Sequence, residues 1–496
     1  MYSPSLKEFL KLSRKGNVIP VYKEINADLD TPVSALLKIK TGDYAFLLES
    51  VEGQEKIARY SFLGTRPSLI FKSKARNIQI EDLRKNTVRR FVTSTDPLDE
   101  IKNIMQEFIP VEIKGLPRFY GGLVGYIGYD MVRFFEKIPD KNKDDLKLPD
   151  CVFILTENLL VFDHVNHTIK IVANIMLPSK KGGLSVSMKS RFYNMAVEQI
   201  ESIHRQLNKP LLTQGLETKT PLRKIKVSSN FTKQEFCKIV SKAKEHIKRG
   251  DIIQVVLSQR FQARIRKQPL DIYRRLRSLN PSPYLFFLKL KDFSLVGSSP
   301  EMLVRCEDGV VQTMPIAGTR RRGRTEKEDR QLAKELLNDK KERAEHLMLV
   351  DLGRNDLGRV SKIGQVKVAE FMRVERYSHV MHLVSEVVGR LDSRFDCYDV
   401  LRAAFPAGTV SGSPKIRAME IVDGLENLRR STYAGCVGYF SFSGNLDTCI
   451  TLRTVLIKDN LAYIQAGSGI VADSRPDKEY QESVNKARAM IEAISG

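Results

Sequence analysis

The chain is 496 residues long; 42% of the residues are hydrophobic and 28% are charged. This composition supplies enough apolar side chains for a large core and excludes disorder as a description of the whole chain. The chain carries 81 lysines and arginines against 59 aspartates and glutamates, a formal net charge of +22. The surplus attracts anions, and because the basic residues are scattered it favours a basic solvated surface over a nucleic-acid site.

Features of membrane or secreted proteins are missing from the sequence. No apolar run approaches the roughly 18 residues that a membrane helix requires. The first residues include Glu8 and lack the apolar stretch of a signal peptide. The six cysteines form no C-x-x-C pair, which is typical of reduced core residues. We therefore expect a cytoplasmic protein. Tryptophan is absent from the chain.

The first two hundred residues are predicted to hold several short strands and two helices. Strands are expected at 44–48, 61–63, 69–72 and 78–80, and two β segments at 152–176, broken at 163–166. Helices are expected at 96–109 and 186–207. Between them, residues 121–129 include four glycines among apolar residues. This pattern indicates close packing of the backbone and not a phosphate-binding loop.

Residues 208–229 are the best candidate for a linker, since they contain Pro210, Gly215 and Pro221 and little periodicity. Three regions follow: 1–207, an N-terminal regulatory region that contributes to the sheets; the linker 208–229; and a catalytic region, 230–496. A helix is expected to begin at the capping box of Thr232 and Glu235 and to end near Gly250.

The remaining chain mixes helices with strands that often come in consecutive pairs. Helices are expected at 270–279, 325–350, 414–425 and 476–494, and strands at 252–261, 284–290, 303–306, 365–374, 377–388, 435–442, 447–457 and 462–466. Consecutive strands favour antiparallel pairing, so the fold class is predicted to be α+β.

Two E-x-x-E pairs lie in predicted helices: Glu342 with Glu345, and Glu479 with Glu482. A spacing of three puts both carboxylates of a pair on one helix face. If the two pairs converge, four carboxylates make an oxygen site suited to Mg²⁺. The more common alternative for such a pair is a solvated helix face.

Two other motifs lend themselves to binding. His379 and His382 invite a zinc interpretation, but in a strand this spacing puts them on opposite faces. The segment Gly467-Ser468-Gly469 lacks the third glycine of a dinucleotide fingerprint, yet a glycine-rich turn of this kind can present backbone amides to an anion.

Two further segments have plain structural interpretations. Ser413 and Pro414 suit the N-cap and first position of a helix. The arginine run 320–324 suits a solvated surface.

Several long segments, in the same order, resemble the chorismate-utilising enzymes. They are 315–320, 345–356, 406–415 and 466–471, joined in the N-terminal half by 47–50, 59–64 and 121–130. Within that family the resemblance is to the branch that makes anthranilate. It implies a four-layer α/β/β/α fold with orthogonally packed, mainly antiparallel sheets. It also implies a Mg²⁺-dependent lyase that aminates chorismate with ammonia and eliminates pyruvate, in the first committed step of tryptophan biosynthesis.

The resemblance implies roles for named residues. Mg²⁺ is held by Glu345 and Glu482, with Glu342 and Glu479 helping directly or through water. The remaining site residues are Gly467, Ser468, Gly469, Arg453 and Tyr433 for the enolpyruvyl carboxylate and side chain, Gly318 and Thr319 for the ring, Glu301 as the acid for the departing hydroxyl, and His382 and Thr409 near the enolpyruvyl group for pyruvate loss.

Ala317 bears on the reaction type. Relatives that make aminodeoxychorismate or isochorismate commonly carry a lysine before this Gly-Thr pair, which acts as nucleophile or base. Alanine can do neither, so it fits direct addition of ammonia at ring carbon 2. It leaves open an enzyme that stops at an aminated intermediate, aminodeoxyisochorismate or aminodeoxychorismate.

The resemblance also implies feedback inhibition by tryptophan. The residues that match the inhibitor site are Leu48, Glu49, Ser50, Pro283, Tyr284 and Leu285. Leu285 stands where relatives often have methionine, a swap that conserves apolar volume. No cysteine has the setting of a glutaminase nucleophile, which implies a separate glutamine amidotransferase subunit and a hetero-oligomer.

Two other functions fit the sequence less well. A basic nucleic-acid-binding protein would need an RNA or DNA module, and none is recognisable. A catalytically silent, tryptophan-sensing family member is disfavoured because every matched carboxylate is intact.

Overall fold

The computed structural model describes residues 1–39, 42–50, 59–178, 184–211, 225–377 and 380–495. Two large β-sheets form its centre, and every pairing between their named strands is antiparallel. The first sheet contains, in order, β1 (Tyr2–Ser3), β2 (Val18–Asn26), β11 (Thr168–Met176), β10 (Asn158–Asp163), β4 (Tyr60–Thr65), β3 (Tyr44–Glu49), β14 (Tyr284–Leu290), β15 (Phe293–Ser299), β24 (Thr454–Lys458), β25 (Leu461–Ile470), β13 (Gln254–Arg264) and β12 (Val227–Ser229), with β21 (Gly412–Ser413) beside β13.

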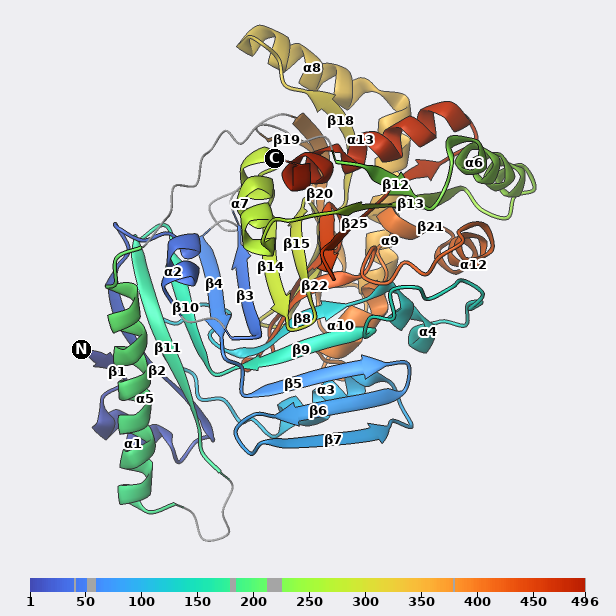
Figure 1. The fold of residues 1–496 in the computed structure, drawn as a ribbon. Helices are drawn as coiled ribbons and strands as arrows, with labels where there is room; N and C mark the ends of the chain where they lie inside the picture. The colour runs from blue at the N-terminus through green and yellow to red at the C-terminus, as the bar shows by residue number, and fades with distance from the viewer. Residues whose placement is uncertain (40–41, 51–58, 179–183, 212–224, 378–379, 496) are drawn as a thin grey trace.

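The second sheet lies across the first (Figure 1). It contains, in order, β18 (Ile316–Arg321), β20 (Val380–Arg390), β17 (Val310–Thr313), β16 (Met302–Glu307), β23 (Leu446–Ile450), β22 (Cys436–Ser441), β8 (Gly122–Ile127), β9 (Cys151–Thr156), β5 (Leu69–Lys74), β6 (Asn77–Asp82) and β7 (Thr87–Val92), with β19 (Lys367–Arg376) beside β20.

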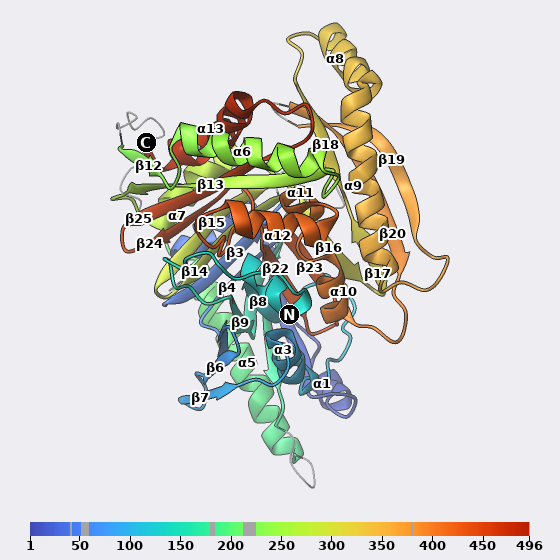
Figure 2. The same cartoon turned by 90° about the vertical axis from the view of Figure 1, so that its right-hand side faces the viewer.

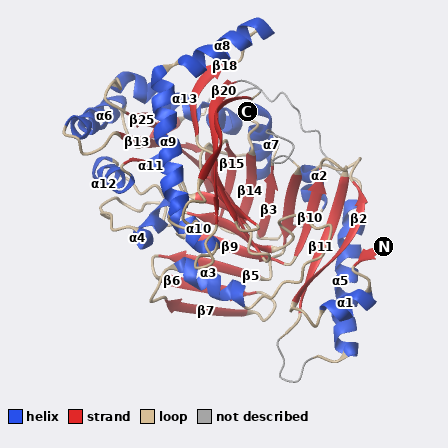
Figure 3. Ribbon diagram, turned by 180° about the vertical axis from the view of Figure 1, so that it is seen from behind, coloured by secondary structure: helices blue, strands red, loops and turns tan. Residues whose placement is uncertain are grey.

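Helices cover the outer faces of both sheets (Figures 1 and 3). They are α1 (Leu6–Leu12), α2 (Pro32–Lys38), α3 (Pro97–Gln106), the 3₁₀ turn η1 (Tyr129–Met131), α4 (Val132–Phe135), α5 (Val186–Leu207), α6 (Lys233–Lys248), α7 (Pro269–Leu279), α8 (Glu326–Asn338), α9 (Lys340–Gly358), α10 (Cys397–Ala404), α11 (Gly408–Ser411), α12 (Lys415–Leu425) and α13 (Pro476–Ser495). No helix of the described residues is long and apolar enough to cross a membrane.

Three apolar clusters define four layers. One cluster packs α1, α2, α5, α7 and α13 on the outer face of the first sheet. A second fills the space between the sheets, with Phe46 and Phe286 on one side and Tyr126 and Val437 on the other. The third packs α3, α9 and α10 on the outer face of the second sheet. The predicted four-layer α/β/β/α fold is confirmed.

The chain crosses from one sheet to the other in places where the sequence looks continuous. The predicted pair of segments at 152–176 is in fact three strands, because the chain leaves the second sheet after β9 and enters the first as β10, with Glu157 between them. The predicted strand at 447–457 is likewise β23 in the second sheet and β24 in the first. Arg453 lies in this second crossing with a left-handed backbone, φ 45°.

Both sheets contain strands from either side of the predicted linker. β3 pairs with β14 in the first sheet, and β8 pairs with β22 in the second, where Gly125 lies opposite Gly438. A Cβ on Gly125 would overlap the carbonyl oxygen of Val152, so the glycines allow the close backbone packing expected from the sequence. Residues 212–224 of the predicted linker lie outside the described residues, and its last three residues form β12.

Two helix predictions need correction. The single helix expected at 325–350 is two helices, α8 and α9, because the Asp339 side chain accepts the amides of Lys341 and Glu342 and starts a new helix. Ser413 is not an N-cap. It belongs to β21, and α12 begins at Lys415 without a side-chain cap. The capping box of Thr232 and Glu235 is confirmed.

Candidate active site

The first E-x-x-E pair lies near the start of α9, where this helix meets β18 and β13. A Cβ built on Gly318 would lie 3.1 Å from Oε2 of Glu342, and Arg320 donates to Oε1 of Glu342 at 3.2 Å. Gln254 donates from Nε2 to Oε1 of Glu345 at 3.1 Å. Burial, followed by the charge of Glu342, raises the pKa of Glu345.

Gln254 also connects Glu345 to the glycine segment of β25. A Cβ on Gly469 would lie 2.7 Å from Nε2 of Gln254. The segment 467–469 is not a turn, as the sequence suggested, but the last part of β25, paired with β13. Its pairing with β24 stops at Ile464. On the edge of β25 that faces β24, the backbone amides after Ile464 have no strand partner in the described chain. These amides, including those of 467–469, can therefore bind an anion.

The second pair lies on the first turns of α13, which Figure 2 shows beside α6 and β13. Burial and the charge of Glu482 raise the pKa of Glu479, whose Oε2 is buried and has no hydrogen-bond partner among the described residues. The ammonium of Lys486 lies 2.7 Å from Oε1 of Glu482. Its charge partly offsets the effect of burial, which raises the pKa of Glu345, Glu479 and Glu301. Lys486 therefore lies within electrostatic reach of four candidate carboxylates.

Lys486 is a site residue that the sequence analysis missed. Its position, four residues after Glu482 on the same helix face, is the signal that would have found it. In the described part of the chain, no three acidic, histidine or cysteine side chains are close enough to hold an ion as they stand. The charge of Lys486 acts on Glu345 of α9 and on Glu479 of α13, but the two carboxylate pairs form no ready-made ion site.

Glu301 is a buried carboxylic acid. It is 8% exposed, and burial raises its pKa to about 8. The nearby Thr409 hydroxyl, Lys486 and Arg453 favour the charged form but do not cancel the effect of burial. Thr409 lines the same cavity, of about 40 Å³, although its hydroxyl makes no hydrogen bond of ordinary geometry with a described residue. At neutral pH Glu301 therefore holds a proton.

His382 has a defined tautomer. Its Nδ1 lies 2.7 Å from the carbonyl oxygen of Gly318 and 3.1 Å from Oγ1 of Thr319. Because a carbonyl can only accept, Nδ1 carries the proton and Nε2 carries the lone pair. Burial lowers the pKa of His382, which favours this neutral form. His379 lies outside the described residues.

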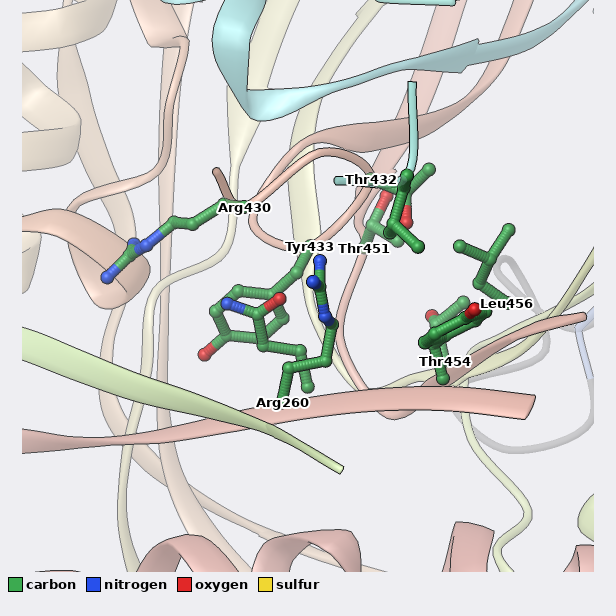
Figure 4. A pocket seen from close by; sticks show the side chains of 10 residues that line it. Arg260, Arg430, Thr432, Tyr433, Thr451, Thr454 and Leu456 are labelled. Atoms are coloured by element: carbon green, nitrogen blue, oxygen red, sulfur yellow. The ribbon is translucent and has the colours of Figure 1, made fainter. Parts of the chain in front are cut away.

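Arg453 and Tyr433 are both close to the chain crossing between β23 and β24. Arg453 donates to Oδ1 of Asn280 at 3.3 Å and lies close enough to His382 and Glu301 to affect their pKa values. Figure 4 shows Tyr433 beside Arg260 and Thr451 in a small cavity of about 20 Å³. Burial raises the pKa of Tyr433 to about 12.

Arg321 and Arg324 of the arginine run are exposed, as expected for a solvated surface, whereas Arg320 and Arg322 are half-buried. Arg320 pairs with Asp339 as well as Glu342, and Arg321 pairs with Glu328 of α8. Arg322 pairs with Asp329. These ion pairs join β18 to α8 and the start of α9.

The six residues of the predicted inhibitor site line one cavity of about 50 Å³. They are Leu48, Glu49, Ser50, Pro283, Tyr284 and Leu285. Arg118 and Asp447 also line it, and they form an ion pair at 3.4 Å. The Ser50 hydroxyl is buried and has no hydrogen-bond partner among the described residues.

Glu49 is tied to α7. Tyr273 donates a hydrogen bond to Oε2 of Glu49, and Arg277 donates to both carboxylate oxygens at 3.1 Å. The cavity is thus lined by apolar side chains together with two carboxylates, Glu49 and Asp447, and two guanidinium groups, Arg118 and Arg305.

The comparisons with known proteins agree with this arrangement. Residues 43–492 match the family model of the chorismate binding enzymes. This chain belongs to that family. It is 48% identical to anthranilate synthase component 1 of Acetivibrio thermocellus, covering 100% of this chain and 99% of the relative. It is 49% identical to the protein of the same name from Aquifex aeolicus (strain VF5), covering 99% and 97%.

Solved structures of the family share the fold. Anthranilate synthase component I from Streptococcus pneumoniae TIGR4 superposes with a TM-score of 0.78 at 36% identity, covering 94% of this chain and 99% of that one. The menaquinone-specific isochorismate synthase MenF from Escherichia coli, at 20% identity and a TM-score of 0.69, shares the fold alone.

Proposed function

We propose that this chain is the large subunit of an anthranilate synthase, a lyase that converts chorismate and ammonia to anthranilate and pyruvate. Two observations support it: the full-length similarity to anthranilate synthase component 1 proteins, and the meeting of Glu342, Gly318 and His382 at one point of the structure. The second observation carries the proposal, because it joins the metal-binding, ring-binding and proton-transfer residues implied by the sequence.

The proposal includes Mg²⁺, whose preferred ligands are hard oxygens. The residues fit, since Glu479 keeps a buried oxygen without a partner among the described residues and Glu345 lies beside a second carboxylate. Glu345 and Glu482 would hold the ion, and Glu342 and Glu479 would help directly or through water. When bound, the ion neutralises the ring carboxylate of chorismate.

The protein's own groups move the protons. Glu301, protonated at neutral pH, gives its proton to the ring hydroxyl, which leaves as water while ammonia adds at ring carbon 2. In the second step, Nε2 of His382 takes the proton of carbon 2, the bond from ring carbon 3 to the ether oxygen breaks, and the departing enolpyruvate receives that proton on its methylene carbon to become pyruvate. The Thr409 hydroxyl is a far weaker base, so it orients the enolpyruvyl group. Arg453, Tyr433 and the amides of 467–469 bind the enolpyruvyl carboxylate and side chain.

Regulation and partners complete the proposal. A cavity with apolar walls and with both carboxylates and guanidinium groups in its lining suits an amino acid with an apolar side chain, which supports tryptophan as a feedback inhibitor. The name component 1 of the relatives supports a partner subunit, for which we propose a glutamine amidotransferase that supplies ammonia. A cytoplasmic location remains a prediction.

The decisive experiment is anthranilate fluorescence from the purified chain with chorismate, Mg²⁺ and ammonium salt at mildly alkaline pH. We expect the emission to grow with ammonium and not with glutamine alone. Chorismate consumed without fluorescence would instead identify an enzyme that stops at an aminated intermediate. Untouched chorismate, even with a cognate glutaminase added, would contradict the proposal.

A further inference from the structure

His346 is a buried histidine that the proposed reaction does not use. It lies on α9 between the carboxylates and the apolar face of the helix, directly after Glu345 and one turn after Glu342. Its Nε2 lies 2.6 Å from the hydroxyl of Ser385 on β20, while Nδ1 has no partner among the described residues. Burying the ring nitrogens costs free energy that an apolar side chain of the same size would not cost. What histidine adds at this position is the hydrogen bond to Ser385.

Ser385 lies opposite a bulge in the neighbouring strand β19. Glu370 pairs with Glu386 and Arg373 with Val384, so two residues of β19 face Ser385 alone. One of them is Met372, whose backbone is left-handed with φ 50°. The Met372 amide donates to the Ser385 hydroxyl at 2.9 Å. The Ser385 hydroxyl oxygen therefore accepts the Met372 amide of the bulge and also contacts His346.

The other edge of β20 carries the ring-binding strand. The Ser385 amide donates to the carbonyl oxygen of Pro315 at 3.2 Å, three residues before Gly318. His382, three residues before Ser385, lies on the opposite face of β20, since side chains alternate along a strand. Ser385 thus connects α9, β18 and β19 to the strand that carries His382.

We propose that His346 is a positioning residue that acts through Ser385 to hold Glu342 and Glu345 in place for Mg²⁺. The bond fixes the rotation of α9, so that Glu345 faces Gln254 and Glu342 faces Arg320. Groups that orient metal ligands typically change metal affinity by about 10- to 100-fold when removed. The inference rests on the proposed function, because it concerns the Mg²⁺ site of that same reaction.

The test compares His346→Leu with His346→Gln. Leucine fills the space without a hydrogen bond, whereas the glutamine amide reaches the position of Nε2. Titration with Mg²⁺ alone in a calorimeter should give at least about a tenfold weaker affinity for the leucine variant. The glutamine variant should bind within about twofold of the unchanged protein, and Ser385→Ala should resemble the leucine variant.

Val350→Ala is the matched control, because it trims a buried side chain of the same helix and leaves the bond between His346 and Ser385 in place. It should lower Tm yet leave Mg²⁺ affinity unchanged. In turnover assays the leucine variant should lose kcat at limiting Mg²⁺ and recover it when Mg²⁺ is raised by the same factor.

Two results would overturn the inference: full Mg²⁺ affinity in His346→Leu, or equal weakening by leucine and glutamine. If the unchanged protein itself binds no Mg²⁺ and makes no anthranilate, the proposed function fails instead. The unchanged protein therefore separates the two failures.

Discussion

Glu301 illustrates how burial prepares a single residue for its role. An exposed glutamate is ionised at neutral pH and has no proton to give. In the buried connection between β15 and β16, Glu301 has a pKa of about 8, so most of its side chain remains protonated at neutral pH. Its backbone is fixed as well, since the Ile450 amide donates to its carbonyl at 3.0 Å.

This pKa predicts the pH dependence of turnover. Because the proton-donating form exists below the folded pKa, activity at a constant concentration of free ammonia should fall as pH rises through about 8. Initial rates over a pH series, with ammonium adjusted at each point, measure this limb. Activity that keeps rising well above pH 9 would contradict the role of Glu301 as an acid.

The same shift affects stability. A glutamate whose pKa is raised on folding favours the folded state least above its folded pKa, where the buried group is charged. We expect Glu301→Gln to raise Tm at pH 9 more than at pH 5. A thermal unfolding series at the two pH values checks this, and an equal effect at both would contradict the burial of an ionising group.

At the scale of elements, two helices share the work of one site. α9 presents Glu342 and Glu345 to β18 and β13, and α13 presents Glu479 and Glu482 near the end of β25. The first carboxylate of each pair, Glu342 or Glu479, lies in the first turn of its helix, where the N-terminal end of the helix dipole favours negative charge. The i, i+3 spacing then keeps both members of a pair on one face.

Glu345→Gln should reduce Mg²⁺-dependent activity by at least about a hundredfold, since it removes one charge from the proposed ligand set. Tryptophan binding, followed by calorimetry, should survive because the inhibitor cavity lies elsewhere. Glu335→Gln on the exposed face of α8 is the control and should remain fully active. A fully active Glu345 variant would rule out the assignment of this residue to the metal.

At the scale of the whole molecule, the inhibitor cavity and the active site use the same two sheets. Asp447 lines the cavity on β23, and the same strand ends at Ile450, which bonds to Glu301. Tyr284, which donates a hydrogen bond to Asp447 at 3.0 Å, lies four residues after Asn280, and Asn280 accepts a hydrogen bond from Arg453. Two short segments therefore connect the cavity with candidate active-site residues.

Ser50→Phe should relieve inhibition by tryptophan and leave turnover largely unchanged. The phenylalanine ring would occupy part of the cavity, so tryptophan could bind there only by overpacking it, which is unfavourable. Inhibition curves at fixed chorismate measure the effect, with at least about a tenfold rise in the half-inhibitory concentration expected for loss of one well-packed contact. Inhibition as strong as in the unchanged protein would argue against this cavity as the regulatory site.

Local patterns predicted most helices and many strands, because periodicity and caps are written in neighbouring residues. Helix α5 and the Thr232 cap are examples. The points near Glu157 and Arg453 where the chain passes from one sheet to the other were not predicted. An apolar run has the same sequence pattern whether it stays in one sheet or continues into the other. The roles of Gln254 and His346 could not be predicted for another reason. Gln254 contacts Glu345 and His346 contacts Ser385, and these partners are far away in the sequence.

The pairing of β8 with β22 has a consequence for how the protein is made. β8 is synthesised early, yet the strand that covers one of its edges leaves the ribosome only near the end of translation. Until then the growing chain carries an unpaired strand edge, which is a template for association with other chains. We expect the N-terminal half, expressed alone, to be captured by chaperones or to aggregate. The second sheet is complete, and this edge of β8 is covered, only after β22 in the last part of the chain has been synthesised.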